Sequence, residues 1–273
     1  MTESGRIAGA FATARSEGRA VRIPFLSAGD PVPSLTVPLC EALARAGADI
    51  IELGVPFSDP LADGPTIQRS SQRALAHGTG LSKCLDLARD VRERIDTALV
   101  IFSYYNPILK MGEEVFVRKA DEAGIDGVLV TDLPLEEGAG LRRLLIRRGI
   151  DPILLVAPTS GAARIETAAR EARGFIYYIS RTGVTGAREA LPEGLTGEVA
   201  AVRAAASLPV AVGFGISSPE QVREVGRVAD GVVVGSALVE VVEKGIEAGM
   251  GDKAFENLPG LMQQAAARLF GTA

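Results

Sequence analysis

Residues 21–53 read VRIPFLSAGDPVPSLTVPLCEALARAGADIIEL and contain the unit from which the rest of the chain is built. A continuous apolar run opens the stretch, an Ala- and Leu-rich amphipathic segment follows and closes on Gly47, and a second apolar run ends it. Continuous apolar runs suit parallel strands that are buried on both faces, and glycine commonly follows the last turn of a helix. The stretch therefore predicts a strand, a helix and a second strand.

The same strand–helix unit recurs along the rest of the chain. The apolar runs are VRIPFLS (21–27), DIIEL (49–53), ALVIFSY (98–104), GVLVTD (127–132), PILLVA (152–157), FIYYIS (175–180), PVAVGF (209–214) and GVVVG (231–235). Eight strand–helix units in regular alternation predict an α/β protein with a parallel sheet. We expect a single (β/α)8 TIM barrel domain over residues 1–273, with an extra N-terminal helix that covers its lower end. An open doubly wound sheet is the alternative, and the lack of a Gly-rich fingerprint after the first run argues against it.

Composition narrows the classes of function. The chain carries a formal net charge of -5 and has no basic run, which argues against nucleic acid or an anionic membrane as a partner. No run of about 18 apolar residues is present, and the first twenty residues lack the apolar core of a signal peptide. Cys40 and Cys84 form no CxxC motif and fall in apolar helical stretches. We therefore expect reduced, buried thiols and a cytoplasmic protein.

The inventory of reactive side chains points to carboxylate chemistry. His77 is the sole histidine and stands in the helix-to-turn stretch ALAHGTG, which disfavours a histidine-based metal site or a Ser-His-Asp triad. None of the lysines ends an apolar run, where the Schiff-base lysine of a barrel enzyme is expected. We expect no metal, and chemistry carried by carboxylates, tyrosines, hydroxyls and backbone groups.

Three acidic residues stand where a barrel places its active site, at or after the carboxyl end of a strand. Glu52 is flanked by apolar residues in the second run, so burial should raise its pKa toward neutrality and let it give and take a proton. A buried ion pair is the alternative. Asp59 and Asp63 follow in the long connection from 54 to about 66, among prolines and glycines. Turn formation alone explains such aspartates, and an oxygen-ligand metal site with Glu52 is a weaker hypothesis.

Glycines after the seventh and eighth runs predict a phosphate site. Gly213 and Gly215 precede the stretch SSPEQ, which has the pattern of a capping box at a helix start, and Gly235 and Ser236 open another helix. Two helix N-termini at neighbouring strands offer free N–H groups to a dianion, and glycine lets the backbone approach it. Ordinary strand-to-helix turns are the alternative.

The connection after the sixth run, from 181 to about 190, contains Gly183, Thr185 and Gly186. It predicts a lid that offers hydroxyl and N–H groups to a ligand, with a flexible surface turn as the alternative. Tyr177, within the sixth run, is a candidate for the barrel mouth, and a core aromatic is the alternative.

These stretches together resemble the tryptophan synthase α-subunit family. The matching blocks are PFLSAGDP (24–31), ELGVPFSDPLADGPTIQ (52–68), SYYNPI (103–108), GVLVTDLP (127–134), SRTGVTGA (180–187), GFGISSPEQV (213–222) and GSALV (235–239). They follow the family order over nearly the whole chain, and the second block is highly specific. Departures from the family pattern are mild, and of these only Thr131 bears on the pocket.

The resemblance implies a lyase of tryptophan biosynthesis that cleaves indole-3-glycerol phosphate to indole and glyceraldehyde 3-phosphate by a retro-aldol reaction. It implies that Glu52 is the catalytic acid–base group, that Asp63 hydrogen-bonds the indole N–H and that Tyr177 lies near the reacting carbons. Implied phosphate contacts are Gly186, Gly215, Gly235 and Ser236, and residues similar to pocket-lining ones are Phe25, Tyr104, Leu129 and Phe214. The implied partner is a tryptophan synthase β subunit in an α2β2 heterotetramer. That subunit, and not this chain, would hold pyridoxal phosphate.

Three other functions fit parts of the sequence. A stand-alone indole-glycerol-phosphate lyase would need no partner. A sugar-phosphate isomerase or synthase would share the phosphate site but not the ELGVPFSDPLADGP block. A barrel that only binds phosphate ligands or activates a partner would not need Glu52 and Asp63.

Overall fold

A closed ring of eight parallel strands forms the centre of the computed structural model, which describes residues 5–179, 194–213, 215–248 and 252–272. The strands are β1 (Val21–Ser27), β2 (Ile50–Gly54), β3 (Ala98–Ser103), β4 (Gly127–Val130), β5 (Asp151–Val156), β6 (Ile176–Ile179), β7 (Val210–Gly213) and β8 (Gly231–Val234). Each strand pairs with the next along the chain, and β8 pairs with β1. The predicted (β/α)8 barrel is confirmed, and the open doubly wound sheet is excluded.

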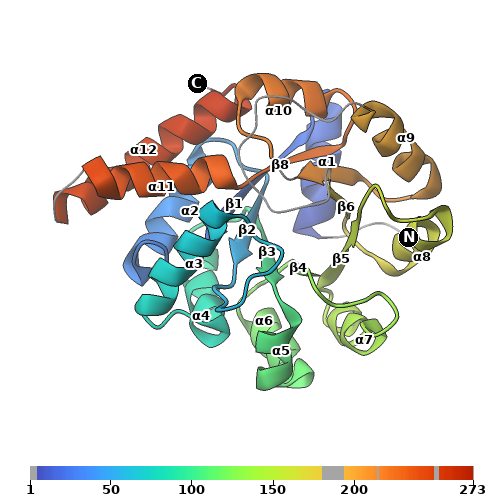
Figure 1. The fold of residues 1–273 in the computed structure, drawn as a ribbon, viewed down its shortest axis with the longest axis horizontal. Helices are drawn as coiled ribbons and strands as arrows, with labels where there is room; N and C mark the ends of the chain where they lie inside the picture. The colour runs from blue at the N-terminus through green and yellow to red at the C-terminus, as the bar shows by residue number, and fades with distance from the viewer. Residues whose placement is uncertain (1–4, 180–193, 214, 249–251, 273) are drawn as a thin grey trace.

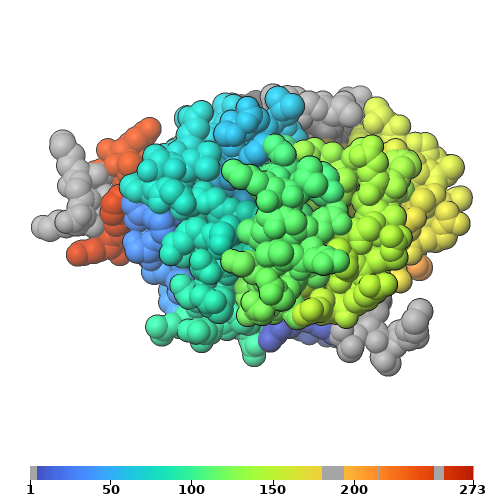
Figure 2. All heavy atoms as spheres, turned by 90° about the horizontal axis from the view of Figure 1, so that it is seen from below, coloured from blue at the N-terminus to red at the C-terminus, as the bar shows by residue number. Residues whose placement is uncertain are grey.

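Helices surround the ring (Figure 1). They are α1 (Arg6–Ser16), the 3-10 helix η1 (Pro33–Leu35), α2 (Thr36–Arg45), α3 (Pro65–Ala76), α4 (Leu81–Arg92), α5 (Tyr105–Met111), α6 (Glu113–Glu122), α7 (Ala139–Arg147), α8 (Ala162–Glu171), α9 (Leu195–Ala205), α10 (Pro219–Gly226), α11 (Ser236–Ala248) and α12 (Asp252–Phe270). In the space-filling view of Figure 2, α4, α5, α6 and α7 form a continuous outer layer over the strands. Gly47, Gly124 and Gly149 follow α2, α6 and α7 at φ of 87°, 71° and 71°, the left-handed region expected of a glycine that ends a helix.

Several predicted runs are longer than the strands they contain. Tyr104 closes the third run but is the N-cap of α5, Gly235 closes the eighth but precedes α11, and Phe175 opens the sixth but precedes β6. All three sit at the ends of the sheet, and Phe175 and Tyr104 are buried. Burial continues into the turns of a barrel, so apolar sequence alone overestimates strand length.

Side-chain alternation along β2 directs Glu52 into the barrel. Ile50 belongs to the cluster of buried side chains inside the ring, whereas Ile51 and Leu53 belong to the cluster between the strands and the helices. Because successive side chains of a strand point to opposite faces, Glu52 shares the inner face with Ile50. The sequence of β2 therefore places one carboxyl group inside an otherwise apolar ring.

The N-terminal helix α1 closes the lower end of the barrel, as predicted. Ile7 lies against Gly127, the first residue of β4, and against Gly174 just before β6. The rings of Phe11 and Phe175 are 5.6 Å apart, centroid to centroid. With this end filled, the inward-facing residues near the carboxyl ends of the strands are left to form a pocket.

Three smaller predictions concern the helices. Cys40 on α2 and Cys84 on α4 are buried and unbridged, as expected. His77 is the C-cap residue of α3, so the prediction of a helix-end histidine is confirmed. Within the described part of the chain, each helix is too short or too polar to cross a membrane.

Candidate active site

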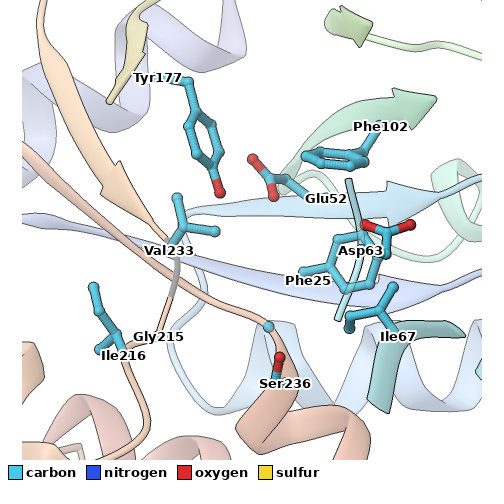
Figure 3. Close-up of a pocket in the computed structure, with 11 residues that line it drawn as sticks. Phe25, Glu52, Asp63, Ile67, Phe102, Tyr177, Gly215, Ile216, Val233 and Ser236 are labelled. Carbon is cyan, nitrogen blue, oxygen red and sulfur yellow. The ribbon is translucent and has the colours of Figure 1, made fainter. Parts of the chain in front are cut away.

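A pocket opens at the carboxyl ends of the strands (Figure 3). It encloses about 460 Å³, including its open mouth, which suits a small-molecule ligand. Its lining residues are Phe25, Glu52, Asp63, Ile67, Phe102, Tyr177, Gly215, Ile216, Val233, Gly235 and Ser236. Acidic residues of the β2 region and glycine turns after β7 and β8, which are far apart in the sequence, therefore share one cavity.

Glu52 is a buried carboxyl group with no partner among the described residues. Its exposed fraction is 0%, and neither Oε atom has a hydrogen bond to any part of the chain that the structure describes. Burial raises the pKa of Glu52 to about 8, because the charged form loses its water. The alternative of a buried ion pair is not found in the described structure. A carboxyl group in this state is protonated at neutral pH and faces the cavity.

Asp63 owes its position to the turn before α3. Its N–H donates to the carbonyl oxygen of Pro60 at 3.0 Å, and the side-chain amide of Gln68 donates to the carbonyl oxygen of Asp63 at 2.8 Å. Burial raises the pKa of Asp63 to about 6, although a hydrogen bond from the Tyr104 hydroxyl acts in the opposite direction. Turn chemistry and a role in the pocket are thus compatible for this aspartate.

Asp59 does not join the other two acidic residues. It is exposed and accepts a hydrogen bond from the Ser58 hydroxyl. Within the described residues no group of three His, Cys, Asp or Glu side chains comes together as metal ligands would. The weaker hypothesis of a metal site at Glu52, Asp59 and Asp63 therefore has no geometric support.

Tyr177 is held inside the barrel by β6, with its hydroxyl pointing toward the Glu52 carboxyl group (Figure 3). Burial, and to a smaller degree the charges of Glu52 and Asp63, raise the pKa of Tyr177 well above its usual value. A side chain at Gly213 would collide with the Tyr177 hydroxyl, because a Cβ atom there would overlap it. Gly213, which was predicted as a phosphate contact, is therefore also required for packing, because its lack of a side chain leaves room for Tyr177 on the neighbouring strand.

Three described residues that were predicted to contact the ligand lie outside the lining: Gly213, Tyr104 and Leu129. The Tyr104 hydroxyl accepts a hydrogen bond from the N–H of Ala62 at 3.0 Å, and its ring lies 5.1 Å from that of Phe57. Tyr104 therefore holds the connection that carries Asp63. Leu129 is fully buried among the side chains inside the ring. Phe25, by contrast, lines the pocket as predicted.

Three of the residues predicted to contact phosphate, Gly215, Gly235 and Ser236, line the pocket. Gly215 adopts a φ of 85°, a left-handed conformation in which a side chain would be strained. Ser236 begins α11, where the N–H groups of Leu238 and Val239 donate to the carbonyl oxygen of Gly235, so the N–H groups of Ser236 and Ala237 are the ones available to a ligand. The start of α10, also predicted to bind phosphate, differs because its N–H groups are capped by its own side chains. At α10 the Ser218 hydroxyl accepts from the N–H of Gln221, whose side chain accepts from the N–H of Ser218, so the predicted capping box satisfies that terminus internally.

Four apolar lining residues were missed by the sequence analysis: Ile67, Phe102, Ile216 and Val233. Phe102 packs edge-on against Phe25, with ring centroids 5.5 Å apart. Phe102 and Val233 occupy inward positions near the carboxyl ends of β3 and β8, and strand alternation could have identified them. Three predicted residues, Thr185, Gly186 and Phe214, lie outside the described residues, as does the proposed lid around Gly183.

Comparisons with known proteins show the family of the chain. Residues 11–267 match the family model described as "Tryptophan synthase alpha chain". A curated tryptophan synthase alpha chain from Geobacter sulfurreducens is 53% identical over 246 residues, which cover 90% of this chain and 93% of the relative. The crystal structure of tryptophan synthase subunit alpha from Legionella pneumophila has a TM-score of 0.86 and 36% identity, over 99% of this chain and 100% of that one. A chain in the structure of the tryptophan synthase complex from Pyrococcus furiosus has a TM-score of 0.81 and 35% identity, over 92% and 98%.

Proposed function

The chain belongs to the tryptophan synthase alpha chain family, lyases of tryptophan biosynthesis, and on that premise we propose that its pocket cleaves indole-3-glycerol phosphate into indole and glyceraldehyde 3-phosphate. The observation that carries the proposal is Glu52, a fully buried carboxyl group at one side of the cavity, without a hydrogen-bond partner among the described residues and with a pKa that burial raises to about 8. On the other side lie Gly215 and the helix start at Ser236 (Figure 3). A substrate with an indole ring and a phosphate tail matches these two ends.

Glu52 can serve both proton transfers of a retro-aldol cleavage. Its carboxyl group first donates a proton to indole C3, which turns the ring into a cation able to accept electrons. The resulting carboxylate then removes the proton of the adjacent glycerol hydroxyl. The bond between C3 and the glycerol carbon breaks, its electrons restore the aromatic ring, and the hydroxyl carbon becomes an aldehyde. Glu52 is protonated again at the end, so the cycle balances without another reactant.

Asp63 supports the cationic stage. Its carboxylate accepts a hydrogen bond from the indole N–H, whose positive charge grows when C3 is protonated. Phe25 and Phe102 supply apolar walls for the ring, and Tyr177 directs its hydroxyl toward Glu52. Thr185, Gly186 and Phe214 complete the proposed contacts.

The pH dependence of kcat/KM should be bell-shaped. The mechanism needs Asp63 ionised and Glu52 protonated, and burial raises their pKa values to about 6 and about 8. Activity should therefore fall below about pH 6 as Asp63 takes up a proton, and above about pH 8 as Glu52 loses one. An initial-rate profile of indole release from pH 5 to 9 checks this. Activity that keeps rising above pH 8 would assign Glu52 the role of a base in the resting enzyme.

The phosphate end can be tested with Gly235→Ala. A Cβ atom at Gly235 would lie 3.6 Å from Phe25, an ordinary contact, so the fold should tolerate it while the methyl group occupies the pocket. We expect KM to rise by about tenfold, the equivalent of roughly 1.4 kcal/mol of lost binding. Gly197→Ala on α9, where a Cβ atom meets nothing within 4 Å, is the matched control. An unchanged KM for Gly235→Ala would remove this turn from the phosphate site.

We further propose that the chain works with a tryptophan synthase β subunit in an α2β2 assembly, and that pyridoxal phosphate belongs to that subunit alone. Leu61, on the connection that carries Asp63, is 89% exposed, and Leu109 on α5 is 57% exposed. Large exposed apolar side chains near an active-site mouth suit a protein partner. The Pyrococcus furiosus relative is part of a tryptophan synthase complex. The predicted cytoplasmic location remains a prediction.

Adding a cognate β subunit should raise the rate of indole release, and the two proteins should co-migrate on gel filtration. Leu61→Asp should weaken co-migration, because a charge would replace an apolar contact. Arg147→Ala, an exposed change on α7, is the control. If the proteins neither co-migrate nor affect each other's rates, the stand-alone lyase becomes the better description.

A further inference from the structure

A cluster of four charged residues joins α3, α11 and the connection after β1. The Arg73 guanidinium donates from Nε and Nη2 to the two carboxylate oxygens of Asp30, at 2.7 and 2.9 Å, and from Nη1 to Glu243 at 2.9 Å. One turn earlier on α3, Arg69 donates from Nε and Nη2 to Glu243, both at 2.8 Å. In the described structure, none of the four residues lines the pocket.

The geometry of the cluster is closely defined. The Asp30 side chain has an exposed fraction of 0% and that of Glu243 14%, so water competes little for either carboxylate. Hydrogen bonds from Arg69, and then from Arg73, lower the pKa of Glu243 and keep it ionised. Paired hydrogen bonds from a planar guanidinium fix the orientation of the carboxylate in addition to its distance. The Arg73 side chain therefore joins two carboxylates that are shielded from water, while the Arg69 side chain, 52% exposed, binds Glu243 from the solvent side.

The two linked helices begin at different parts of the pocket. α3 begins at Pro65, shortly after Asp63, and contributes Ile67 to the lining. α11 begins at Ser236, where the phosphate group is proposed to bind. Any shift of one helix against the other changes the distance between the ring-binding and phosphate-binding ends.

From this arrangement we infer that Glu243, held by Arg69 and Arg73, is a positioning residue that fixes the start of α11 relative to α3 and so sets the phosphate-binding geometry. The inference rests on the proposed function of the pocket, since Gly235 and Ser236 matter here as phosphate contacts. Glu243 itself touches neither substrate nor the reacting atoms.

Glu243→Gln is the variant of choice. It breaks the charged link to α11 but keeps the Asp30–Arg73 pair, whereas a change at Arg73 would leave the buried Asp30 carboxylate uncompensated and endanger the fold. Glu247→Gln is the matched control, because Glu247 is an exposed carboxylate on the same helix, one turn after Glu243.

Two measurements test the inference. The first is the dissociation constant for inorganic phosphate, taken from thermal stabilisation of the intact protein, which does not need catalysis. The second is the split between KM and kcat for indole release. For Glu243→Gln we expect phosphate binding and KM to weaken by about tenfold with kcat within about twofold, since small misplacements of a binding group cost this much. Glu247→Gln should match the wild type.

Wild-type phosphate affinity and KM in a folded Glu243→Gln protein would overturn the inference. So would a loss confined to kcat, which a general structural defect would also produce. If instead the wild type itself releases no indole, the proposed function fails, while the phosphate measurement still tests the link between Glu243 and the turn at Ser236.

Discussion

Replacing Glu52 by glutamine lowers kcat for indole release by about 10²- to 10⁴-fold and leaves KM nearly unchanged, because general acid–base groups contribute a rate factor of this size. Glutamine has nearly the shape of a protonated glutamate but cannot transfer a proton. The Glu52 side chain is fully buried and has no hydrogen-bond partner in the described structure, so the exchange breaks no internal hydrogen bond. The loss should therefore appear in the chemical step.

Steady-state kinetics of the variant, with substrate binding measured separately, checks this expectation. Glu122→Gln removes an exposed carboxylate at the end of α6 and is the control for a change of net charge. A Glu52→Gln enzyme that turns over within about threefold of the wild type has lost less than about 0.7 kcal/mol of transition-state stabilisation. That result would remove Glu52 from the proton transfers and turn attention to Tyr177.

The second large effect concerns stability. Burial raises the pKa of Glu52 from 4.5 to about 8, so between these values the folded protein holds a proton that the unfolded chain has released. The associated stability is fully present below about pH 4.5 and is lost as the pH rises toward 8, by at most about 1.4 kcal/mol per pH unit. Glu52→Gln has no such proton, so its free energy of unfolding should fall less steeply over this window.

Urea unfolding of both proteins at several pH values from 5 to 9 gives the difference in slope. Contributions from Asp63 and from every other titrating group are present in both proteins and cancel, provided that the folds match. Glu122→Gln should keep the wild-type slope. Parallel stability curves for the wild type and Glu52→Gln would mean that Glu52 is solvated and ionised at neutral pH.

The fold could be predicted because each strand of this barrel is buried on both faces. Runs such as GVVVG at β8 therefore stand out from the amphipathic segments around them. The sequence favours closure of the ring without proving it, since closure depends on the pairing of β1 with β8, two runs separated by about 200 residues of chain. Strand ends at Tyr104 and Phe175 could not be located, because the turns are buried as well.

The site could be predicted where polar residues interrupt apolar sequence. Glu52 in β2 and the glycine turn at Gly235 carry such a signal, and the structure brings both to one pocket. Ile216 could not be recognised, because an apolar side chain gives the same signal whether it lines a cavity or fills the core. Tyr104 was predicted to line the pocket, but it supports the connection that carries Asp63. The sequence does not distinguish these two roles.

The protonation state of Glu52 can be observed directly by carbon-13 NMR of protein labelled at the glutamate carboxyl carbon, with Glu52→Gln used to assign the signal. A Glu52 carboxyl that titrates near pH 8 in the free enzyme is the expected result, since burial alone raises its pKa to about 8. A Glu52 signal that titrates near 4.5, the value of a glutamate in water, would show a solvated carboxylate and leave the proposed cleavage without its proton donor.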